Sequence, residues 1–417
     1  MVNSSIMHDC LSGLKVVYST ASTSIEKVHR KLSSKFNNFN SLNRFSLILT
    51  SCAVFGLVGS KPSIAAVIYS VTDIGTLGGA SSAAFDINDN GQVVGTAGIV
   101  GVGNRAFLWD STSGIRNLDP LGTDTSIANG INNNGQVVGF YLGVGTNKRA
   151  FLWDSVNDLQ NLGTLPGDNS SAANEINDRG QVVGRSESIG RIQAFLWDSV
   201  NGLQNLGTLN GYSSSDAYDI NNNGEVVGFA NTNGSLRPVL WDSSKNIQDL
   251  GSFNTAFTQA NSINDAGTVV GGSIFDGFRA LLWDRTNSVQ NLNTFDGFPN
   301  SFATDINNNG QTVGSTSSST SSNSRAVLWE NGIATDLNAL IDPNSGWRLD
   351  SATAINNKGQ IVGSGFLNNQ RLIRAFLLTP LTQIPKSIPE PTSALGLLSG
   401  ILGSIYFLKR SASIRHN

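Results

Sequence analysis

Cysteine, histidine and methionine are absent from residues 67–385 of this 417-residue chain. The two cysteines, two methionines and three histidines of the protein all lie outside that stretch. The stretch therefore has no disulfide, no metal site with cysteine or histidine ligands, and no nucleophile activated by a histidine base.

Positive charge is also scarce in this stretch. Residues 67–385 contain 16 Lys and Arg against 27 Asp and Glu, a net charge of −11. Such a balance argues against nucleic acid or an anionic lipid surface as a partner for this stretch as a whole. With few charges and many Gly, Asn and Ser residues, the composition is typical of a secreted or surface-bound β protein.

One string recurs through the same stretch. The pattern I-N-D/N-x-G-x-x-V-G occurs seven times, at intervals of 43 to 49 residues. A fixed period in this range indicates an array of like supersecondary units rather than one irregular domain. The copies begin at Ile87, Ile131, Ile176, Ile220, Ile263, Ile306 and Ile355.

Each repeat contains four short segments with the character of β-strands. In the third copy they are residues 170–177, 180–186, 193–198 and 202–209, each bounded by Gly, Asn, Asp or Ser. The third segment is apolar at consecutive positions, which requires that both of its faces be covered. Four-stranded sheets stacked around an axis meet that requirement. The sequence therefore predicts an all-β fold, a seven-bladed β-propeller of four-stranded blades over residues 67–385.

The two ends of the array predict a closed ring. Residues 69–77 match the fourth segment of a repeat, yet no third segment precedes them. The last copy ends with its third segment, residues 374–378, and lacks a fourth. We expect the N-terminal strand to complete the last blade and so remove exposed strand edges. An open solenoid, or a different four-stranded array, is the alternative.

Most recurring residues have an architectural explanation. An alanine stands three positions before each motif isoleucine, where a small side chain fits a crowded position. The motif Asn and the Gly three residues later suit a tight turn between strands. A tryptophan ends the third segment in six repeats and Leu378 replaces it in the seventh, so we expect packing between blades. These tryptophans are Trp109, Trp153, Trp197, Trp241, Trp283 and Trp329.

A calcium loop is a competing interpretation for three of the seven copies. Their D-x-N-x-N-G pattern resembles the start of a calcium-binding loop. None has a glutamate at the twelfth position, and the other four copies lack the first aspartate, which favours a turn motif. The candidate ligands are Asp86, Asn88, Asn90, Asp219, Asn221, Asn223, Asp305, Asn307 and Asn309.

Residues 1–66 are expected to form a signal or leader region. Basic residues between Lys27 and Arg44 precede an apolar run at 45–59 and a small-residue site at 63–66, the order of a secretory signal peptide. The leading region is unusually long. An uncleaved anchor is an alternative, although 15 apolar residues are few for crossing a bilayer. Residues 49–52 also resemble a lipobox, but apolar sequence continues after them.

Residues 386–417 have the order of a C-terminal sorting segment. The tripeptide Pro389, Glu390, Pro391 precedes an apolar stretch at 392–408, which is short for a spanning helix, and then a basic tail. The tail cations are Lys409, Arg410 and Arg415. This arrangement closely resembles the PEP-CTERM sorting signal of Gram-negative-type bacteria, including cyanobacteria. The resemblance implies export, transient retention in the inner membrane through a C-terminal helix, and processing near Pro389 by an exosortase-type enzyme. An ordinary anchor without processing is the alternative.

The repeats themselves resemble the HAF-repeat family of extracellular bacterial proteins. The matching strings include D-I-G-T-L at 73–77, N-L-G-T-L at 161–165 and Q-A-F-L-W at 193–197. The family's histidine is replaced in six repeats by arginine and in the third by Gln193, so a role for imidazole is lost. The arginines are Arg105, Arg149, Arg237, Arg279, Arg325 and Arg374. No defined activity attaches to the family, so the resemblance implies a fold and an extracellular or cell-surface location.

The sequence predicts a non-enzymatic binding or matrix component without a cofactor. One alternative is lectin-like binding of extracellular polysaccharide, since Tyr141, Tyr212, Phe275 and Trp347 lie in polar loops. Another is a glycan-active enzyme that uses paired carboxylates, for which Asp342 and Asp350 in the irregular last repeat are the candidates. No unique acidic cluster breaks the periodicity elsewhere, which disfavours catalysis. Other surface proteins are possible partners, and the ligand is not specified by the sequence.

Overall fold

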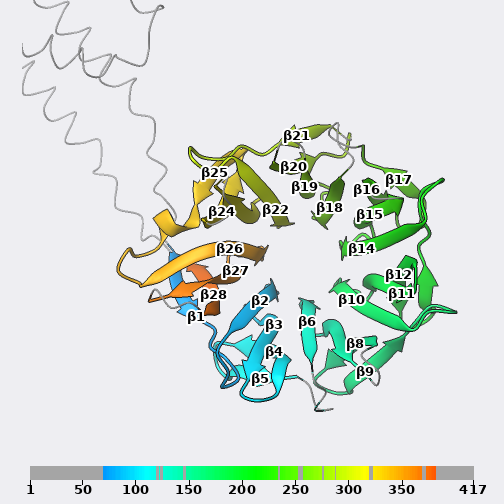
Figure 1. Cartoon of the computed structure of the whole chain (residues 1–417), viewed down its shortest axis with the longest axis horizontal. Helices are drawn as coiled ribbons and strands as arrows, with labels where there is room; N and C mark the ends of the chain where they lie inside the picture. Colours follow the sequence, from blue (N-terminus) through cyan, green and yellow to red (C-terminus); the bar gives the residue numbers. More distant parts are fainter. Residues whose placement is uncertain are drawn as a thin grey trace, which may run out of the picture. The chain divides into compact units, whose positions relative to one another are not determined.

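The chain folds as an all-β ring of seven four-stranded sheets (Figure 1). A computed structural model describes residues 69–381, except 119–121, 123–124, 144–146, 233–234, 252–256, 275–276, 287, 319–322 and 369–371. The expected leader and sorting segments, with their targeting helices, lie outside these residues. Within the described part, we find no apolar helix of membrane-spanning length.

Every blade is an antiparallel sheet whose strands follow one another from the channel to the rim. Blade 1 consists of β2 (Ser82–Ile87), β3 (Val93–Ile99), β4 (Gly103–Asp110) and β5 (Gly114–Asn117), and blade 2 of β6 (Ser126–Ile131), β7 (Val137–Leu142), β8 (Lys148–Asp154) and β9 (Asp158–Gly163). Blade 3 consists of β10 (Ser170–Ile176), β11 (Val182–Ser188), β12 (Arg191–Asp198) and β13 (Gly202–Asn205), and blade 4 of β14 (Ser214–Ile220), β15 (Val226–Thr232), β16 (Ser235–Trp241) and β17 (Ile247–Asp249).

The remaining blades repeat this order with one change. Blade 5 consists of β18 (Thr258–Ile263), β19 (Val269–Ile274), β20 (Phe278–Trp283) and β21 (Val289–Asn291), and blade 6 of β22 (Asn300–Ile306), β23 (Thr312–Ser317), β24 (Ser324–Glu330) and β25 (Ile333–Asp336). A short 3-10 helix, η2 (Leu337–Leu340), follows blade 6. Blade 7 consists of β26 (Trp347–Ile355), β27 (Ile361–Leu367), β28 (Ile373–Pro380) and β1 (Tyr69–Asp73).

Ring closure by the N-terminal strand is confirmed. β1 pairs antiparallel with β28, from Tyr69 opposite Pro380 to Asp73 opposite Phe376. Arg374 adds an ion pair across this seam, with its Nη2 2.8 Å from Asp73 Oδ2. The two ends of the array therefore complete one sheet, and β1 covers the edge of β28 that would otherwise be exposed.

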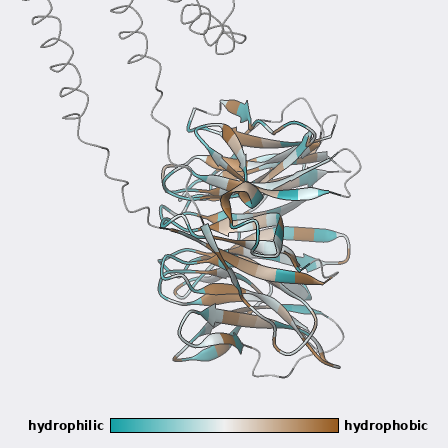
Figure 2. Ribbon diagram, turned by 90° about the vertical axis from the view of Figure 1, so that its left-hand side faces the viewer, coloured by the Kyte–Doolittle hydropathy of each residue, from teal (hydrophilic) through white to brown (hydrophobic). Residues whose placement is uncertain are grey.

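Seven hydrophobic cores lie between neighbouring blades, and each contains the tryptophan, or Leu378, near the end of a third strand. Trp153 of blade 2, for example, packs with Val94, Ala106 and Leu108 of blade 1, and Leu378 fills the same place in blade 7. All six tryptophans are buried. Figure 2 shows hydrophobic stretches along the strands. The expected packing of these side chains between blades is confirmed.

A β-bulge in each innermost strand explains the glycine that ends the motif. The register shifts between Ala173 and Glu175, for example, where β10 pairs with β11. A Cβ at Gly184 would overlap the carbonyl oxygen of Ala172 and press against the Cα of Ala173. All seven equivalent glycines face the same overlap, and the alanine three positions before each isoleucine is fully buried. The bulge therefore requires glycine on one strand and a small side chain on the other.

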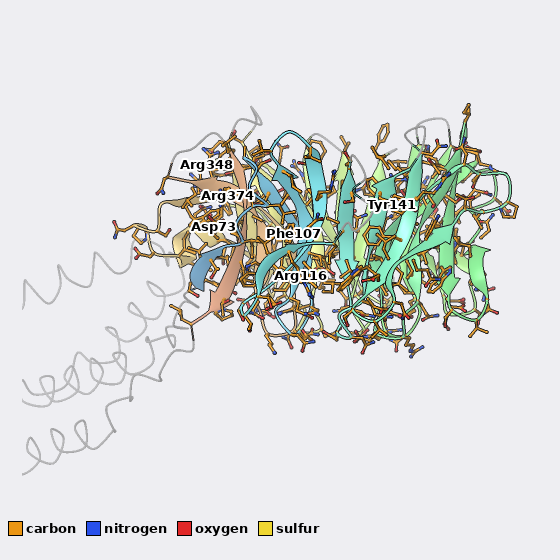
Figure 3. All side chains as sticks on the ribbon, turned by 90° about the horizontal axis from the view of Figure 1, so that it is seen from below. Asp73, Phe107, Arg116, Tyr141, Arg348 and Arg374 are labelled. Atoms are coloured by element: carbon orange, nitrogen blue, oxygen red, sulfur yellow. The ribbon has the colours of Figure 1, made fainter. Side chains whose placement is uncertain are left out.

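The ring has two faces that differ in sequence. We call the face with the motif turns, such as residues 88–92, the motif face; the third and fourth strands also connect there. The far face carries the connections between second and third strands, such as residues 100–102, and those between blades. Figure 3 shows the ring edge-on, with Arg348 and Arg374 toward the far face and Arg116 toward the motif face. Because β1 begins and β28 ends on the motif face, the described chain enters and leaves there.

Candidate functional site

The site with the most distinct geometry is the mouth of the central channel on the motif face. A cavity of about 170 Å³ lies there and is lined by every motif copy. Seven of its lining residues are acidic and none is Lys or Arg. The acidic residues are Asp86, Asp89, Glu175, Asp178, Asp219, Asp265 and Asp305.

The motif asparagines form a closed ring around this mouth. The Nδ2 of each donates a hydrogen bond to the backbone oxygen of its counterpart in the next blade, over 2.9–3.1 Å, and Asn356 closes the ring by donating to Asn88. Their Oδ1 atoms accept backbone N–H groups of the same turn, as Asn177 does from Arg179 and Gln181. The expected turn role is thus present, together with a contact between blades that the sequence alone did not reveal.

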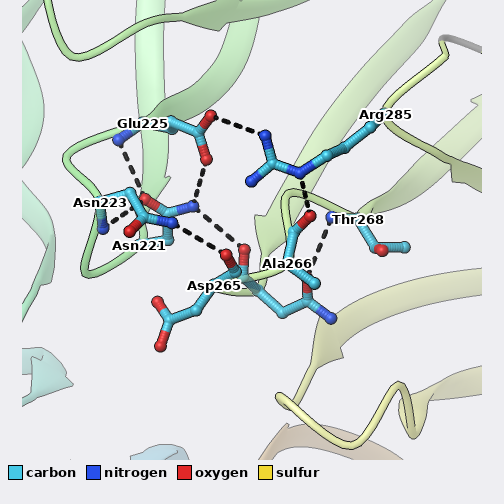
Figure 4. Close-up of polar contacts among 8 residues, drawn as sticks. Asn221, Asn223, Glu225, Asp265, Ala266, Thr268 and Arg285 are labelled. Carbon is cyan, nitrogen blue, oxygen red and sulfur yellow. Dashed lines mark hydrogen bonds and ion pairs between the residues drawn. The ribbon is translucent and has the colours of Figure 1, made fainter.

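A second closed ring is formed one residue later in the motif. The backbone N–H of each residue at this position donates to the side-chain Oδ1 of its counterpart in the next blade, over 2.8–3.0 Å. Either Asp or Asn can accept this bond, which explains why the position alternates between the two. Figure 4 shows blades 4 and 5, where Asn223 Nδ2 also donates to Asp265 O at 2.8 Å and Arg285 pairs with Glu225 at 3.5 Å.

Four carboxylates line the channel just inside these rings. Asp86 accepts the backbone N–H of Ile87 and, across the blade boundary, that of Ile131, both at 2.7 Å. Asp219 and Asp305 bridge their own and the next blade in the same way. Glu175 accepts only from Ile176, at 2.8 Å.

These carboxylates stand at the position directly before the motif isoleucine. The odd number of blades explains the irregular order of residues at that position. Three aspartates serve two blades each, so the blades that follow them need no acid and have Gly130, Ser262 and Ala354 instead. Blade 3 is left without a blade to share a carboxylate with, and its Glu175 accepts only the N–H of its own Ile176. The longer side chain reaches the space beside Gly130, because a Cβ there would overlap Glu175 Oε1. Four carboxylates thus satisfy the N–H groups of all seven motif isoleucines.

Burial and mutual repulsion perturb these four acids. Burial, followed by the charge of Asp305, raises the pKa of Asp86 to about 7, although two backbone N–H groups oppose the shift. The same causes raise the pKa of Asp219 to about 6. Burial raises the pKa of Asp305, and burial together with Asp86 and Asp219 raises that of Glu175 well above its usual range. Perturbed pKa values of this kind mark the channel as a candidate site by electrostatics.

The candidate calcium ligands lie in these rings and do not converge on one point. Within each copy the aspartate points into the channel ring, while the first asparagine joins the asparagine ring. The second asparagine donates its Nδ2 to the next blade, as Asn90 does to Asn133 O at 2.9 Å. Among the described residues, no group of three or more acidic side chains has an arrangement able to hold a metal ion. The oxygens that a calcium ion would need accept backbone N–H groups instead.

The other candidate residues have structural partners. Asp350 pairs with Arg348 at 2.9 Å, and Asp342 caps a turn by accepting the N–H of Asn344. Trp347 is half-buried and packs edge-on against Phe376, with ring centroids 6.0 Å apart. Tyr141 and Tyr212 pack against cores between blades, and Phe275 lies outside the described residues. The three described rings are each partly buried by this packing.

One polar cluster could not be predicted from the sequence, because its residues form no recurring motif. Asp216 of blade 4 is 3% exposed and lies 3.0 Å from Arg185 of blade 3, while Asn174 donates to it at 3.1 Å. Burial raises the pKa of Asp216 to about 6 even though Arg185 opposes the shift. Tyr218 lies beside them and stacks edge-on with Phe229. The cluster links blades 3 and 4 through this ion pair and hydrogen bond.

Comparison with known proteins supports the fold and leaves the activity open. A family model described as "Protein of unknown function (DUF3466)" matches residues 278–379. No curated protein matches the chain. A solved streptogramin B lyase structure is similar with a TM-score of 0.51 at 9% identity, over 75% of this chain and 98% of that one. The virginiamycin B lyase of Staphylococcus aureus gives a TM-score of 0.49 at 10% identity, over 75% of this chain and 100% of that one. Likeness at such identity shows the propeller fold alone.

Proposed function

We propose that this protein is an exported, non-enzymatic propeller that acts at the cell surface or outside the cell as a binding or matrix component. One observation carries the proposal. The polar side chains at the channel mouth, including all four inner carboxylates, hydrogen-bond to the backbone of their own or the neighbouring blade. A catalytic acid or base needs an oxygen free to reach substrate. Both oxygens of Asp86, Asp219 and Asp305, and one oxygen of Glu175, instead accept backbone N–H groups that hold the ring together.

The far face is the surface that differs between repeats. Its connections between second and third strands range from the two residues after Ser188 to the Ser-rich loop after Ser317. Functional residues in repeat folds lie on variable loops that a constant scaffold positions. We therefore place binding on the far face. Export is supported by the sequence order of the two terminal segments, which frames the propeller with a leader and a PEP-CTERM-like end.

Cell fractionation combined with the intact mass of the mature protein tests this proposal. We expect the protein in the envelope or the medium, with a mass that lacks the leader up to about residue 66 and the segment after about Pro389. A full-length mass in the cytoplasm would refute export. A purified protein that cleaves polysaccharide, and loses that activity in Asp350→Ala, would refute the non-enzymatic role.

A further inference from the structure

The charge of the ring is segregated between its two faces. The described acidic residues in the motif-face half are Asp86, Asp89, Asp110, Asp154, Asp158, Glu175, Asp178, Asp198, Asp219, Glu225, Asp242, Asp265, Asp284, Asp305 and Glu330. The described basic residues there are Arg116, Arg179, Lys245, Arg285 and Lys358. The motif-face half is therefore strongly negative and repels anionic surfaces.

The far-face half is close to neutral. Its described acidic residues are Asp73, Asp168, Glu187, Asp216, Asp249, Asp296, Asp336, Asp342 and Asp350, and its described basic residues are Arg105, Lys148, Arg149, Arg185, Arg191, Arg237, Arg279, Arg325, Arg348 and Arg374. Arginines pair with several of these acids, as Arg191 does with Asp168 at 2.5 Å. A face with balanced and paired charges has a much smaller electrostatic cost of approaching an uncharged lipid surface than the motif face has.

Apolar side chains project from the loop tips of this same face. Ile189 is 100% exposed and Val100 is 76% exposed, and both lie beside glycines with positive φ at tight turns. The other exposed apolar residues of the far face belong to blades 1, 5 and 7 or to the connection that enters blade 5. They are Val102, Phe257, Ile274, Phe278, Leu372 and Ile373. These tips belong to several blades and form separate projections around the ring.

We propose that the far face docks on an uncharged lipid surface, with these loop tips in the boundary between headgroups and acyl chains. A bilayer is planar and can receive projections from several blades at once, and each buried apolar side chain adds to the affinity. A protein partner of ordinary size would instead favour one contiguous apolar patch. The motif face also has exposed apolar side chains, at Val156, Val200, Ile333 and Leu381, but they lie on a face with a large excess of carboxylates. Asp154 and Asp198, for example, bind the backbone N–H groups of Val156 and Val200 in the same hairpins.

The C-terminal segment is long enough to permit this orientation. This step rests on the proposed membrane retention through residues 392–408. β28 ends on the motif face, and residues 382–391 reach at most about 36 Å when extended. The eight residues of β4 span about 27 Å from one face toward the other. A chain held at its C-terminus can therefore still place its far face on the same bilayer.

A fluorophore attached at one position tests the orientation in the full chain. Cys10→Ser and Cys52→Ser leave an introduced cysteine as the single thiol, since residues 67–385 have none. Ile189→Cys and, as the matched control on the motif face, Val200→Cys carry an environment-sensitive dye in phosphatidylcholine vesicles that contain a doxyl-labelled lipid quencher. We expect the dye at position 189 to lose most of its emission and the dye at position 200 to keep it.

Each other outcome overturns the proposal. Quenching at position 200 alone would mean that the motif face lies against the bilayer, and no quenching at either position would mean that neither face does. A blue shift at position 189 without lipid, growing with protein concentration, would assign the far face to a second copy of this chain.

A double variant tests the loop tips themselves. With the dye at Leu372→Cys, we expect Val100→Asp together with Ile189→Asp to abolish quenching, while Val156→Asp with Val200→Asp leaves it unchanged. Equal effects of both pairs would contradict the assignment. Because this measurement uses purified chain and added vesicles, it can fail while export, measured in cells, still holds.

Discussion

At the scale of single residues, the residues of the recurring string form hydrogen bonds between neighbouring blades. The motif asparagine is buried and makes contacts in two directions: its amide crosses to the next blade and its oxygen closes its own turn. Sequence reasoning identified the turn, because Asn and Gly at this spacing predict one. It could not identify the contact across blades, since that partner lies in a copy more than 40 residues away.

Asn177→Ala should therefore cost more stability than one side-chain hydrogen bond. The substitution leaves the backbone oxygen of Asn221 and the N–H groups of Arg179 and Gln181 without their partner. We expect a loss of about 2–4 kcal/mol in the free energy of unfolding, measured with chemical denaturant. Asn134→Ala removes an exposed neighbour and serves as the control, with a loss below about 1 kcal/mol. Equal effects would contradict the role given to the asparagine ring.

Gly184→Ala tests the bulge. The new Cβ would overlap the backbone of Ala172 and Ala173, which flexible side chains cannot relieve. We expect a loss of about 3 kcal/mol or more, or failure to fold. Gly98→Ala, where the nearest atoms lie at ordinary contact distances of 3.6–3.7 Å, should be tolerated. A stable Gly184→Ala protein with an unchanged melting temperature would exclude a tight bulge at this position.

At the scale of strands, the sequence predicted the fold with few errors. Seven copies of the string predicted the blade count, and the offset phase of the two ends predicted the closing strand; both are confirmed. The site was less predictable. The four channel carboxylates come from four different repeats, so only ring closure brings them together, and their alternation depends on pairing between neighbouring blades.

Deletion of residues 69–73 tests the closing strand. Without β1, the edge of β28 is exposed and Arg374 loses Asp73. We expect a lower melting temperature and faster amide exchange in β28 than in β12, its counterpart in blade 3. Removal of residues 1–66 alone is the control and should leave the exchange of β28 unchanged. Unaltered exchange after deletion of residues 69–73 would show that the ring closes without this strand.

At the scale of the whole molecule, the channel carboxylates should make stability fall as pH rises. Asp86 and Asp219 have native pKa values raised from 3.8 to about 7 and about 6, so the native state binds protons more tightly than the unfolded chain. Their contribution is fully present below about pH 4 and is lost as pH rises through 6 and 7. Acids with lowered pKa values, such as Asp154 and Asp198, are ionised in both states over that window and do not oppose the trend.

Glu175→Gln isolates this effect. The amide oxygen can still accept the N–H of Ile176, while the charge that repels Asp86 and Asp219 disappears. We expect a higher melting temperature than that of the parent at pH 8, a smaller difference at pH 5, and a flatter dependence between them. A variant that is less stable than the parent at pH 8 would contradict mutual repulsion in the channel.

The repeated string holds the blades together, and the proposed binding belongs to the far face. Hydrogen exchange of the purified protein, with and without the envelope fraction of its host cell, tests it most directly. We expect new protection in the far-face loops around Val100, Ile189 and Phe278, and none in the motif turns. Protection of the motif turns, with unchanged far-face loops, would contradict it.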